Sequence, residues 1–262
     1  MRTNVALDGK IGKIIEVYDL HKAYGALVAV DGVSFSVDTG EVFGILGPNG
    51  AGKTTTVEIL EGMRAPDRGT AFINGVNVRK DPRGVKDIIG IQLQSSAFFD
   101  RLTLAELLEM FASLYCRSID PMELLRDVEL SDRAKSRFRE LSGGQKQRFS
   151  IATTLVNDPL VLFLDEPTSG LDPQARRHMW ELVKLFKDQG RTVVLTTHYM
   201  EEAEELCDRV AIMDHGKIVA MDPPDALIES LLDKGFQKQR VEKLANLEDV
   251  FLDLTGRALR NE

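Results

Sequence analysis

A glycine-rich segment is the first part of this sequence whose residue types could do chemistry. Residues 47–54 read GPNGAGKT and lie between an apolar run at 42–46 and a helical pattern, TTTVEILEGM. In a strand–loop–helix unit, glycines let several backbone N–H groups point at one anion at the positive end of the helix. Lys53 would reach the β and γ phosphates of a nucleotide, and the Thr54 hydroxyl would hold Mg²⁺. An ordinary glycine-rich turn with an incidental lysine is the alternative. The predicted phosphate loop comprises Gly47, Pro48, Asn49, Gly50, Ala51, Gly52, Lys53, Thr54 and Thr55.

Two adjacent carboxylates follow a second apolar run, LVLFL at 160–164. The carboxyl end of a buried parallel strand is where α/β sheets place their ligands. A helix cap would need one carboxylate, whereas two suggest a division of roles. We expect Asp165 to support Mg²⁺ and Glu166 to polarise the water that attacks the γ phosphate. His198 directly follows TVVLTT at 192–197, and we expect it to contact the same phosphate, although a histidine at a strand end is by itself more often structural.

A third segment, LSGGQ at 141–145, places a serine and two glycines just before an amphipathic helix. It therefore predicts a second anion-binding helix start, formed by Ser142, Gly143, Gly144 and Gln145. One nucleotide does not need two such sites from one chain. We predict a head-to-tail dimer in which Ser142 and Gly144 of one copy close over the γ phosphate held by Lys53 of the other. An ordinary capped helix would explain Ser142 but not the double glycine.

The elements that would position these residues follow an α/β pattern. Residues 14–37 alternate apolar and polar positions and predict short antiparallel strands. The runs at 42–46, 160–164 and 192–197 are apolar without alternation and are separated by helical patterns, which indicates a largely parallel sheet covered on both faces. Residues 100–140 predict a helical block with a capping box at Thr103 and Glu106. Further helices are expected at 145–156 and 173–190, and a hairpin turning at 215–216.

Composition limits the classes of function. A chain of 262 residues with 43% hydrophobic content can form one large α/β core or two small domains. The formal charge of −8 argues against a broad nucleic-acid interface, so no nucleic-acid partner is expected. Cys116 and Cys207 are expected to be buried small hydrophobes in a reducing compartment. No stretch approaches the 18 to 20 apolar residues of a membrane span, and the first ten residues lack an apolar signal core, so we expect a chain that neither crosses a membrane nor is exported.

Four segments in this order resemble the ATP-binding subunit of ATP-binding cassette (ABC) transporters: GPNGAGKTT, LSGGQKQR, LVLFLDEPTSGLD and TTHYMEEAEELCDRVAIMDHGKI. The resemblance runs from about Ile14 to Leu227. It implies a P-loop NTPase fold of ABC-ATPase type, with a largely parallel core sheet, an antiparallel β layer and a helical subdomain. The implied domains are an ATPase domain at 1–227, with its helical subdomain at about 95–157, and a C-terminal helical extension at 228–262.

The resemblance also implies roles that spacing does not assign. Tyr24 matches the aromatic residue that stacks on adenine, and Gln94 matches the glutamine that senses Mg²⁺ and water, with Gln92 nearby as a competing register. Asp172 matches the loop that couples the two sites of a dimer, and His198 matches the histidine that contacts the γ phosphate. ATP and Mg²⁺ are the implied cofactors.

The implied partners are integral-membrane permease subunits and a second copy of the chain or a related ABC ATPase. The chain would then lie on the cytoplasmic face of the cell membrane, held by the membrane subunits. In this family the helical block receives a coupling helix of the permease, and Phe98, Phe99 and Leu102 are candidates for that groove, although they could equally be core residues. The tail VEKLANLEDVFLDLTGRAL resembles the end of ATPases that serve drug and polysaccharide exporters, including daunorubicin-resistance-like systems of ABC-2 type. We therefore expect export of a drug or of another hydrophobic or glycan substrate.

Two other classes of function are alternatives. A soluble ABC-type ATPase that acts on DNA usually carries a long coiled-coil or zinc-bearing insertion before LSGGQ, and one that acts on ribosomes usually has two cassettes and a basic linker. This chain has one cassette, an ordinary helical interval and an acidic balance. A P-loop kinase for a small substrate would leave LSGGQ unexplained.

Overall fold

The structure is a computed structural model that describes residues 12–92 and 98–236. The contacts within the chain divide it into two units, residues 1–227 and 228–262. The first unit holds the phosphate loop, the LSGGQ segment, the carboxylate pair and His198. Of the second unit, residues 228–236 are described, and helix α8 (Pro224–Asp233) runs across the division. The helical subdomain and the C-terminal helical extension stay predictions, and the apolar stripe of the tail lies outside the described residues.

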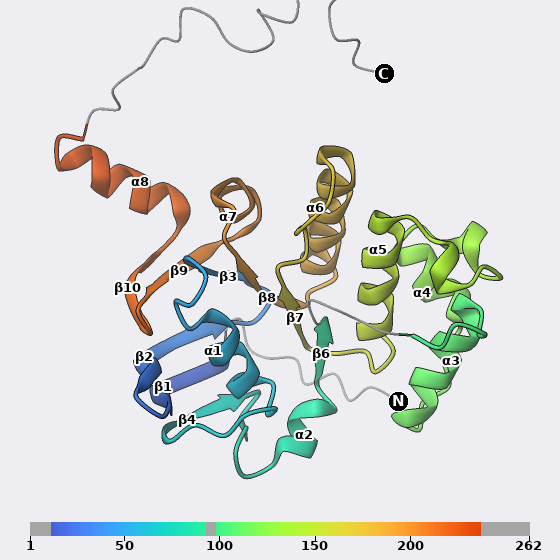
Figure 1. Ribbon diagram of the computed structural model, residues 1–262, viewed down its shortest axis with the longest axis horizontal. Helices are drawn as coiled ribbons and strands as arrows, with labels where there is room; N and C mark the ends of the chain where they lie inside the picture. Colours follow the sequence, from blue (N-terminus) through green and yellow to red (C-terminus); the bar gives the residue numbers. More distant parts are fainter. Residues whose placement is uncertain (1–11, 93–97, 237–262) are drawn as a thin grey trace, which may run out of the picture. The chain divides into compact units, whose positions relative to one another are not determined.

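A six-stranded sheet forms the centre of the first unit, with strand order β10-β9-β3-β8-β7-β6 (Figure 1). All neighbouring pairs are parallel except β9 and β10. The strands are β3 (Val42–Leu46), β6 (Ile89–Gln92), β7 (Val161–Asp165), β8 (Thr192–Thr197), β9 (Arg209–Asp214) and β10 (Lys217–Asp222). The predicted hairpin at 215–216 joins the last two strands. The predicted fold class, with its largely parallel core sheet, is confirmed.

The central strands are apolar throughout because both faces of the sheet are covered. Along β7, Val161 and Phe163 belong to one hydrophobic cluster, whereas Leu162 and Leu164 belong to the other. Successive side chains of a strand point to opposite faces, so each face needs apolar residues. This explains why the sequence shows an unbroken apolar run rather than alternation.

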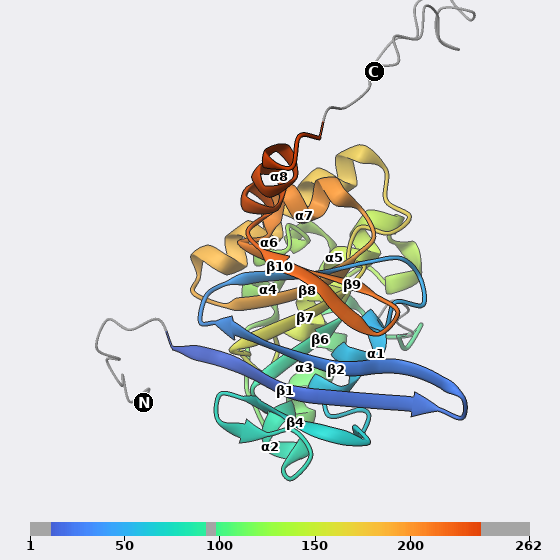
Figure 2. The ribbon, with the colours of Figure 1, turned by 90° about the vertical axis from the view of Figure 1, so that its left-hand side faces the viewer.

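One face is covered by helix α1 (Lys53–Leu60), helix α2 (Pro82–Lys86) and an antiparallel sheet of order β2-β1-β4-β5 (Figure 2). The strands of this sheet are β1 (Lys13–Tyr24), β2 (Leu27–Asp38), β4 (Arg68–Ile73) and β5 (Val76–Asn77). The prediction of short strands at 14–37 was wrong, because β1 and β2 have 12 residues each. Gly25 lies at the turn between the two strands. Gly32, with φ of 74°, lies inside β2, at a shift in the pairing register with β1.

The other face is covered by helices (Figure 1). They are α3 (Leu104–Leu114), α4 (Pro121–Asp127), α5 (Gly143–Thr154), α6 (Pro173–Asp188) and α7 (Met200–Leu206), with short 3₁₀ turns η1 (Ser131–Arg133) and η2 (Phe138–Glu140). The capping box predicted for α3 is confirmed, since the Thr103 hydroxyl accepts from the Glu106 N–H and the Glu106 carboxylate accepts from the Thr103 N–H. Among the described residues, no helix is long and apolar enough to cross a bilayer.

The prediction that both cysteines are buried holds for Cys207 and is wrong for Cys116. Helix α3 ends at Leu114, and Cys116 follows in a turn with φ of 52°, a conformation in which the chain leaves the helix at the surface. The helical pattern of the sequence therefore extended past the point where the helix stops.

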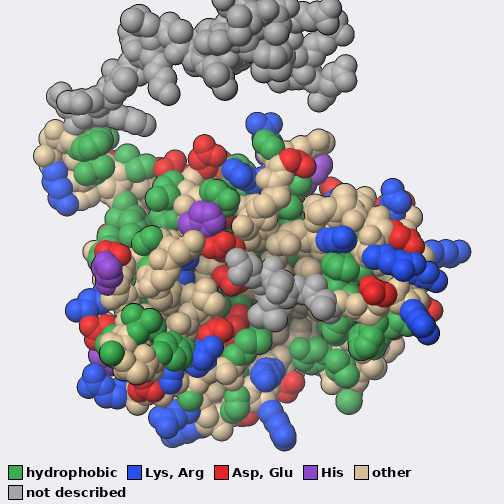
Figure 3. Space-filling view, in the orientation of Figure 1, with side chains coloured by type: hydrophobic (Ala, Val, Ile, Leu, Met, Phe, Trp, Pro, Cys, Tyr) green, Lys and Arg blue, Asp and Glu red, His purple; other side chains and the backbone are tan. Residues whose placement is uncertain are grey.

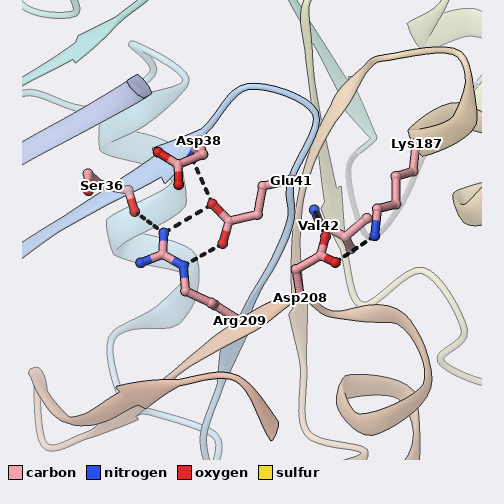
Figure 4. Close-up of polar contacts among 7 residues, drawn as sticks. All are labelled: Ser36, Asp38, Glu41, Val42, Lys187, Asp208 and Arg209. Atoms are coloured by element: carbon pink, nitrogen blue, oxygen red, sulfur yellow. Dashed lines mark hydrogen bonds and ion pairs between the residues drawn. The ribbon is translucent and has the colours of Figure 1, made fainter. Parts of the chain in front are cut away.

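A buried ion pair joins the two sheets at the amino end of β3 (Figure 4). Arg209 at the start of β9 donates to both carboxylate oxygens of Glu41, at 2.6 and 3.0 Å, and to the Ser36 carbonyl of β2 at 2.7 Å. Glu41 also accepts from the Asp38 N–H at 2.7 Å. Only 8% of the Glu41 side chain is exposed. These bonds fix the start of β3, and with it the position at which β3 delivers the phosphate loop.

Asp208 connects the same region to helix α6. Its carboxylate accepts from the Val42 N–H of β3 at 2.9 Å and from the Lys187 ammonium of α6 (Figure 4). Lys187 and Asp208 are each 39% exposed, so solvent screens this ion pair far more than the pair between Glu41 and Arg209.

We predict that Arg209→Met lowers the free energy of unfolding by about 3 kcal/mol, because it leaves the buried Glu41 carboxylate without its partner. Lys187→Met is the matched control, since it removes the exposed pair and should cost less than about 1 kcal/mol. Urea denaturation of both variants measures the difference. Equal losses in the two variants would contradict the assignment of the buried pair.

Candidate functional site

The predicted phosphate loop connects β3 to α1, and two of its glycines are required by close backbone approaches. A Cβ atom on Gly52, whose φ is 100°, would lie 2.2 Å from the Ala29 carbonyl oxygen, and one on Gly47 would lie 2.3 Å from the Met213 carbonyl oxygen. The loop is thus pressed between β2 and β9. Gly52 is the N-cap of α1 and provides no side-chain hydrogen bond to the first turn. The free N–H groups there can take an anion.

Lys53 places a positive charge inside this loop. Its side chain is 5% exposed, and the ammonium donates to the carbonyl oxygens of Gly47, at 2.8 Å, and Pro48, at 3.1 Å. The backbone of Ala51 stabilises the loop. Its N–H donates to the Pro48 carbonyl, and its carbonyl accepts from the Gly216 N–H. Pro48 and Ala51 therefore shape the loop through their backbones.

A pocket of about 430 Å³ opens over the loop, and nine of the predicted site residues line it. Its lining consists of Tyr24, Leu27, Ala29, Asn49, Gly50, Gly52, Lys53, Thr54, Thr55, Asp165 and Glu166. Acidic side chains are visible near the middle of the face seen in Figure 3. The residues predicted from separate motifs thus line one cavity, with Tyr24 at the β1–β2 hairpin and Lys53 at the start of α1. Leu27 and Ala29 were not predicted.

The carboxylate pair and the histidine meet at the carboxyl ends of adjacent strands. Asp165 of β7 pairs with Thr196 of β8, and the Thr196 hydroxyl donates to the Asp165 carboxylate. The next residue, Glu166, has a φ of 46°, which is rare for a residue with a side chain. Its N–H donates to Thr196, and its Oε1 lies 3.0 Å from Nδ1 of His198. The structure therefore places Glu166 and His198 in direct contact.

The LSGGQ segment lines a different pocket of about 280 Å³ at the start of α5 and α6. This pocket contains Ser142, Gly143, Gly144, Gln145 and Asp172 and, within the described part of the chain, shares no lining residue with the pocket over the phosphate loop. One copy of the chain therefore keeps its two predicted phosphate-binding segments in separate pockets.

The structure shows that part of this segment serves the fold. The Ser142 hydroxyl accepts from the Gln145 N–H at 3.3 Å, and the Gln145 side chain accepts from the Ser142 N–H at 3.0 Å, which completes a capping box. A Cβ atom on Gly144 would lie 3.0 Å from Cβ of Ala175 on α6, whereas one on Gly143 would meet no described residue within 4 Å. Asp172 caps α6 by accepting from the Ala175 N–H at 2.8 Å. Helix packing thus accounts for Gly144 but not for Gly143.

Gln94 lies outside the described residues. Gln92, its competitor in register, ends β6, is 2% exposed, and its amide makes no hydrogen bond to the described residues.

Two buried acids near the site were not predicted. Glu61, at the end of α1, is 3% exposed, and its pKa is raised to about 8 by burial and by the charges of Asp165 and Glu58. Glu202 of α7 is fully buried, and burial raises its pKa against the opposing hydroxyls of Thr197 and Thr168. In the sequence both lie among other charged residues of helical segments, so no local signal marks them as buried.

The donor set of the first pocket fits Mg²⁺. Thr54 and Asp165 contribute a hydroxyl and a carboxylate to one pocket, and such oxygen donors suit a hard cation that is held by few protein ligands and by the phosphates of its nucleotide. Within the described residues, no cluster of three or more His, Cys, Asp or Glu side chains gathers as an all-protein metal centre.

The fold and the pocket define a P-loop nucleotide-binding protein, and comparison with known proteins identifies its family. The sequence model described as ABC transporter matches residues 30–169. The chain is 43% identical over 221 residues to the Nod factor export ATP-binding protein I of Burkholderia orbicola (strain AU 1054), covering 82% of this chain and 73% of that protein. The chain belongs to the ABC transporter family and is an ABC transporter ATPase.

Solved structures agree with this assignment. A structure described as the ATP-binding subunit of an ABC transporter superimposes with a TM-score of 0.74 at 31% identity, covering 92% of this chain and 99% of that one. A dimeric ATP-binding cassette in a post-hydrolysis state, bound to ADP and Pi, has a TM-score of 0.72 at 26% identity and covers 80% of this chain and 98% of its own. ABC ATPases of this fold thus include dimeric members.

We predict that Glu61→Gln makes stability less dependent on pH. An acid with a pKa of about 8 in the folded state and about 4.5 in the unfolded state loses a proton on unfolding between these values, so the parent's stability falls as pH rises from about 4.5 to about 8. The Gln variant should gain a few kcal/mol relative to the parent across this window.

Urea denaturation at pH 5 and pH 8 measures this change. Glu204→Gln, which alters an exposed acid of α7, is the control and should keep the parent's pH dependence. Parallel stability profiles for the parent and Glu61→Gln would exclude the buried, protonated state of Glu61.

Proposed function

We propose that the chain is the motor subunit of an ABC exporter, which binds Mg·ATP in the pocket over the phosphate loop and hydrolyses it as a head-to-tail dimer. The observation that carries the proposal is the single pocket lined by Tyr24, Lys53, Thr54, Asp165 and Glu166. Its aromatic ring can stack on a base, and its ammonium and free N–H groups can bind phosphates. Its hydroxyl and carboxylate oxygens can bind Mg²⁺, and a second carboxylate can activate water.

Each residue has a role that follows from its position. The N–H groups of Gly50 and Gly52 and the Lys53 ammonium hold the β and γ phosphates, for which the ammonium exchanges its bonds to the Gly47 and Pro48 carbonyls. Bound Mg²⁺ would be held by Thr54 and Asp165 and would neutralise the charge that develops on the phosphates. Glu166 accepts a proton from the attacking water.

His198 is proposed to contact the γ phosphate and to orient Glu166. Its Nδ1 lies within hydrogen-bond distance of the Glu166 carboxylate, so a single side chain can link the base to the transferred phosphate. The left-handed conformation of Glu166 turns the carboxylate out of β7 towards this histidine, and backbone strain of this kind is concentrated at functional sites. Gln94 keeps its proposed role as a Mg²⁺ and water sensor.

The second pocket supports a dimer. Among residues 12–92 and 98–236, Gly143 has no neighbour that requires a glycine, and Ser142 and Gln145 lie beside it at a helix N-terminus. We infer that this surface closes over the γ phosphate in a second copy or a related cassette, with Asp172 coupling the two sites. The dimeric cassette among the similar structures supports this arrangement.

The transport role is inferred from the family and from relatives named for export. Membrane permease subunits would hold the chain at the cytoplasmic face and would carry a hydrophobic, drug-like or glycan substrate. Of the three groove candidates, Phe98 packs against Phe138 and Phe149 of the core, with ring centroids 4.4 and 5.3 Å apart, whereas Phe99 is 64% exposed. Phe99 is therefore the better candidate for a coupling-helix contact. Copurification with an integral-membrane protein tests this role, and recovery of a ribosome or DNA complex would favour the soluble alternative.

We predict that Glu166→Gln lowers ATP turnover by about two to four orders of magnitude while ATP binding is retained, because the general base is lost and the phosphate loop is intact. The variant should accumulate as an ATP-bound dimer in size-exclusion chromatography. Glu181→Gln, an exposed position of α6, should turn over ATP at the parent rate. Undiminished turnover would remove Glu166 from the mechanism.

We predict that Lys53→Ala abolishes most hydrolysis by weakening phosphate binding, since the only loop ammonium that approaches the pocket in the described chain is removed. Titration with ATP and a turnover assay measure both effects. Lys80→Ala, which removes an exposed lysine outside the pocket, should behave as the parent. Normal hydrolysis by Lys53→Ala would show that the loop has been misassigned.

A further inference from the structure

Tyr24, the residue proposed to stack on the nucleotide base, lies at an exposed position. It ends β1 next to the turn at Gly25, and 40% of the residue is exposed. An aromatic ring at the tip of a hairpin has rotamer freedom, and fixing it only when a ligand arrives would weaken binding. Contacts that hold the ring towards the pocket before a ligand binds would therefore strengthen binding.

Arg64 provides one contact to the ring. This residue follows α1, and its guanidinium carbon lies 5.3 Å from the centroid of the Tyr24 ring, within the range of a cation–π contact. The guanidinium is itself held, because Nε donates to the Glu58 carboxylate at 2.6 Å and the Arg64 N–H donates to the Glu58 carbonyl at 3.1 Å. These two bonds favour an orientation of Arg64 over the ring.

Glu58 lies on helix α1, whose first residue is Lys53. The ring of Tyr24 is thus connected through Arg64 and Glu58 to the same helix that begins at the phosphate loop. A helix is rigid over this short distance, so the spacing between the aromatic ring and the phosphate loop is set by one element.

A second connection holds the backbone next to the ring. The Asp67 carboxylate accepts from the Ala23 N–H and from the Lys22 ammonium, both at 2.8 Å. The Lys22 ammonium lies 5.7 Å from the Tyr24 ring centroid. The segment between α1 and β4 thereby holds both the backbone and the side chain at the end of β1.

We propose that Arg64, held by Glu58, is a positioning residue that fixes the Tyr24 ring as the platform for the nucleotide base at a set distance from the phosphate loop. This inference rests on the proposed function of the pocket, and it adds a role to two residues outside the pocket lining. A stacked base loses part of its favourable energy if the platform must first be ordered, so removal of Arg64 should weaken binding of the base and leave binding of the phosphates unchanged.

The rival explanation is that Arg64 attracts phosphates by its charge alone. The two explanations differ in their dependence on the base, which dissociation constants of ADP and of inorganic pyrophosphate separate, because only ADP carries a base. Both ligands are stable in the presence of the enzyme, so the full-length chain can be titrated directly by calorimetry.

In Arg64→Met, which keeps the aliphatic stem, we expect ADP affinity to fall about two- to fivefold, while pyrophosphate affinity stays within about twofold. Glu58→Gln changes the net charge in the opposite direction but also frees Arg64. It should therefore also weaken binding of ADP relative to binding of pyrophosphate. If charge alone mattered, the two variants would change affinity in opposite directions, and the affinities for both ADP and pyrophosphate would change.

Arg68→Met is the matched control. Arg68 of β4 lies beside the His21 ring, at 3.4 Å, and has no contact with Tyr24 among those found in the described residues, so its loss removes the same charge without releasing the ring. It should leave the ratio of the two dissociation constants unchanged. In a Tyr24→Leu background, Arg64→Met should have no further effect on that ratio.

The inference is overturned if Tyr24→Leu lowers the preference for ADP over pyrophosphate and Arg64→Met does not. It is also overturned if Arg64→Met and Arg68→Met weaken the binding of both ligands to the same extent. If Tyr24→Leu itself leaves the preference unchanged, base stacking in this pocket is excluded, and the inference is excluded with it. Failure of the parent to bind either ligand would instead refute the proposed function of the pocket.

Discussion

The parallel pairing of β3, β8 and β7 is the constraint on which the site depends. Leu46 of β3 pairs with Thr197 of β8, and Asp165 of β7 pairs with Thr196, so three strands that lie far apart in the sequence end at one edge of the sheet. The phosphate loop, the carboxylate pair and His198 each follow one of these ends. Their convergence therefore needs no further interaction between the segments, and a shift of one residue in any strand would separate the groups that line the pocket.

The opposite edge of the sheet shows how this register is held. Arg209 and Asp208 bind Glu41 and the Val42 N–H at the amino end of β3, next to the antiparallel sheet and helix α6 (Figure 4). The polar groups that fix the strands and those that form the pocket thus lie at opposite ends of the same short strands. This separation lets the pocket keep a strained Glu166 and a glycine-rich loop, features that cost stability locally.

Much of the fold and of the site could be predicted because the signals are local. The strand at 192–197 and the start of α6 at Pro173 were placed by apolar runs and by a proline at a helix start, and the phosphate loop was placed by its spacing. Features that arise from contacts between distant segments could not be predicted in this way. Ala29 enters the pocket because β2 approaches Gly52, and Glu61 is buried at the end of α1, where the charge of Asp165 on β7 acts on it. Neither feature follows from neighbouring residues in the sequence. The lengths of β1 and β2 were missed because a bulge accommodates Gly32 inside a strand.

In the LSGGQ segment, the two glycines differ in what the structure explains. The sequence argument takes the two glycines as one signal for a partner nucleotide, but the close approach of Ala175 on α6 favours a glycine at Gly144 within a single copy of the chain. The argument for a partner nucleotide therefore depends on Gly143, which is the first residue of α5 and for which no contact in the described part of the chain demands a glycine. Ser142 is engaged in a capping box, so its hydroxyl would have to exchange the Gln145 N–H for a phosphate oxygen. In the proposed dimer, a partner's nucleotide would compete with this cap, so closure would depend on the γ phosphate as well as on the protein surfaces.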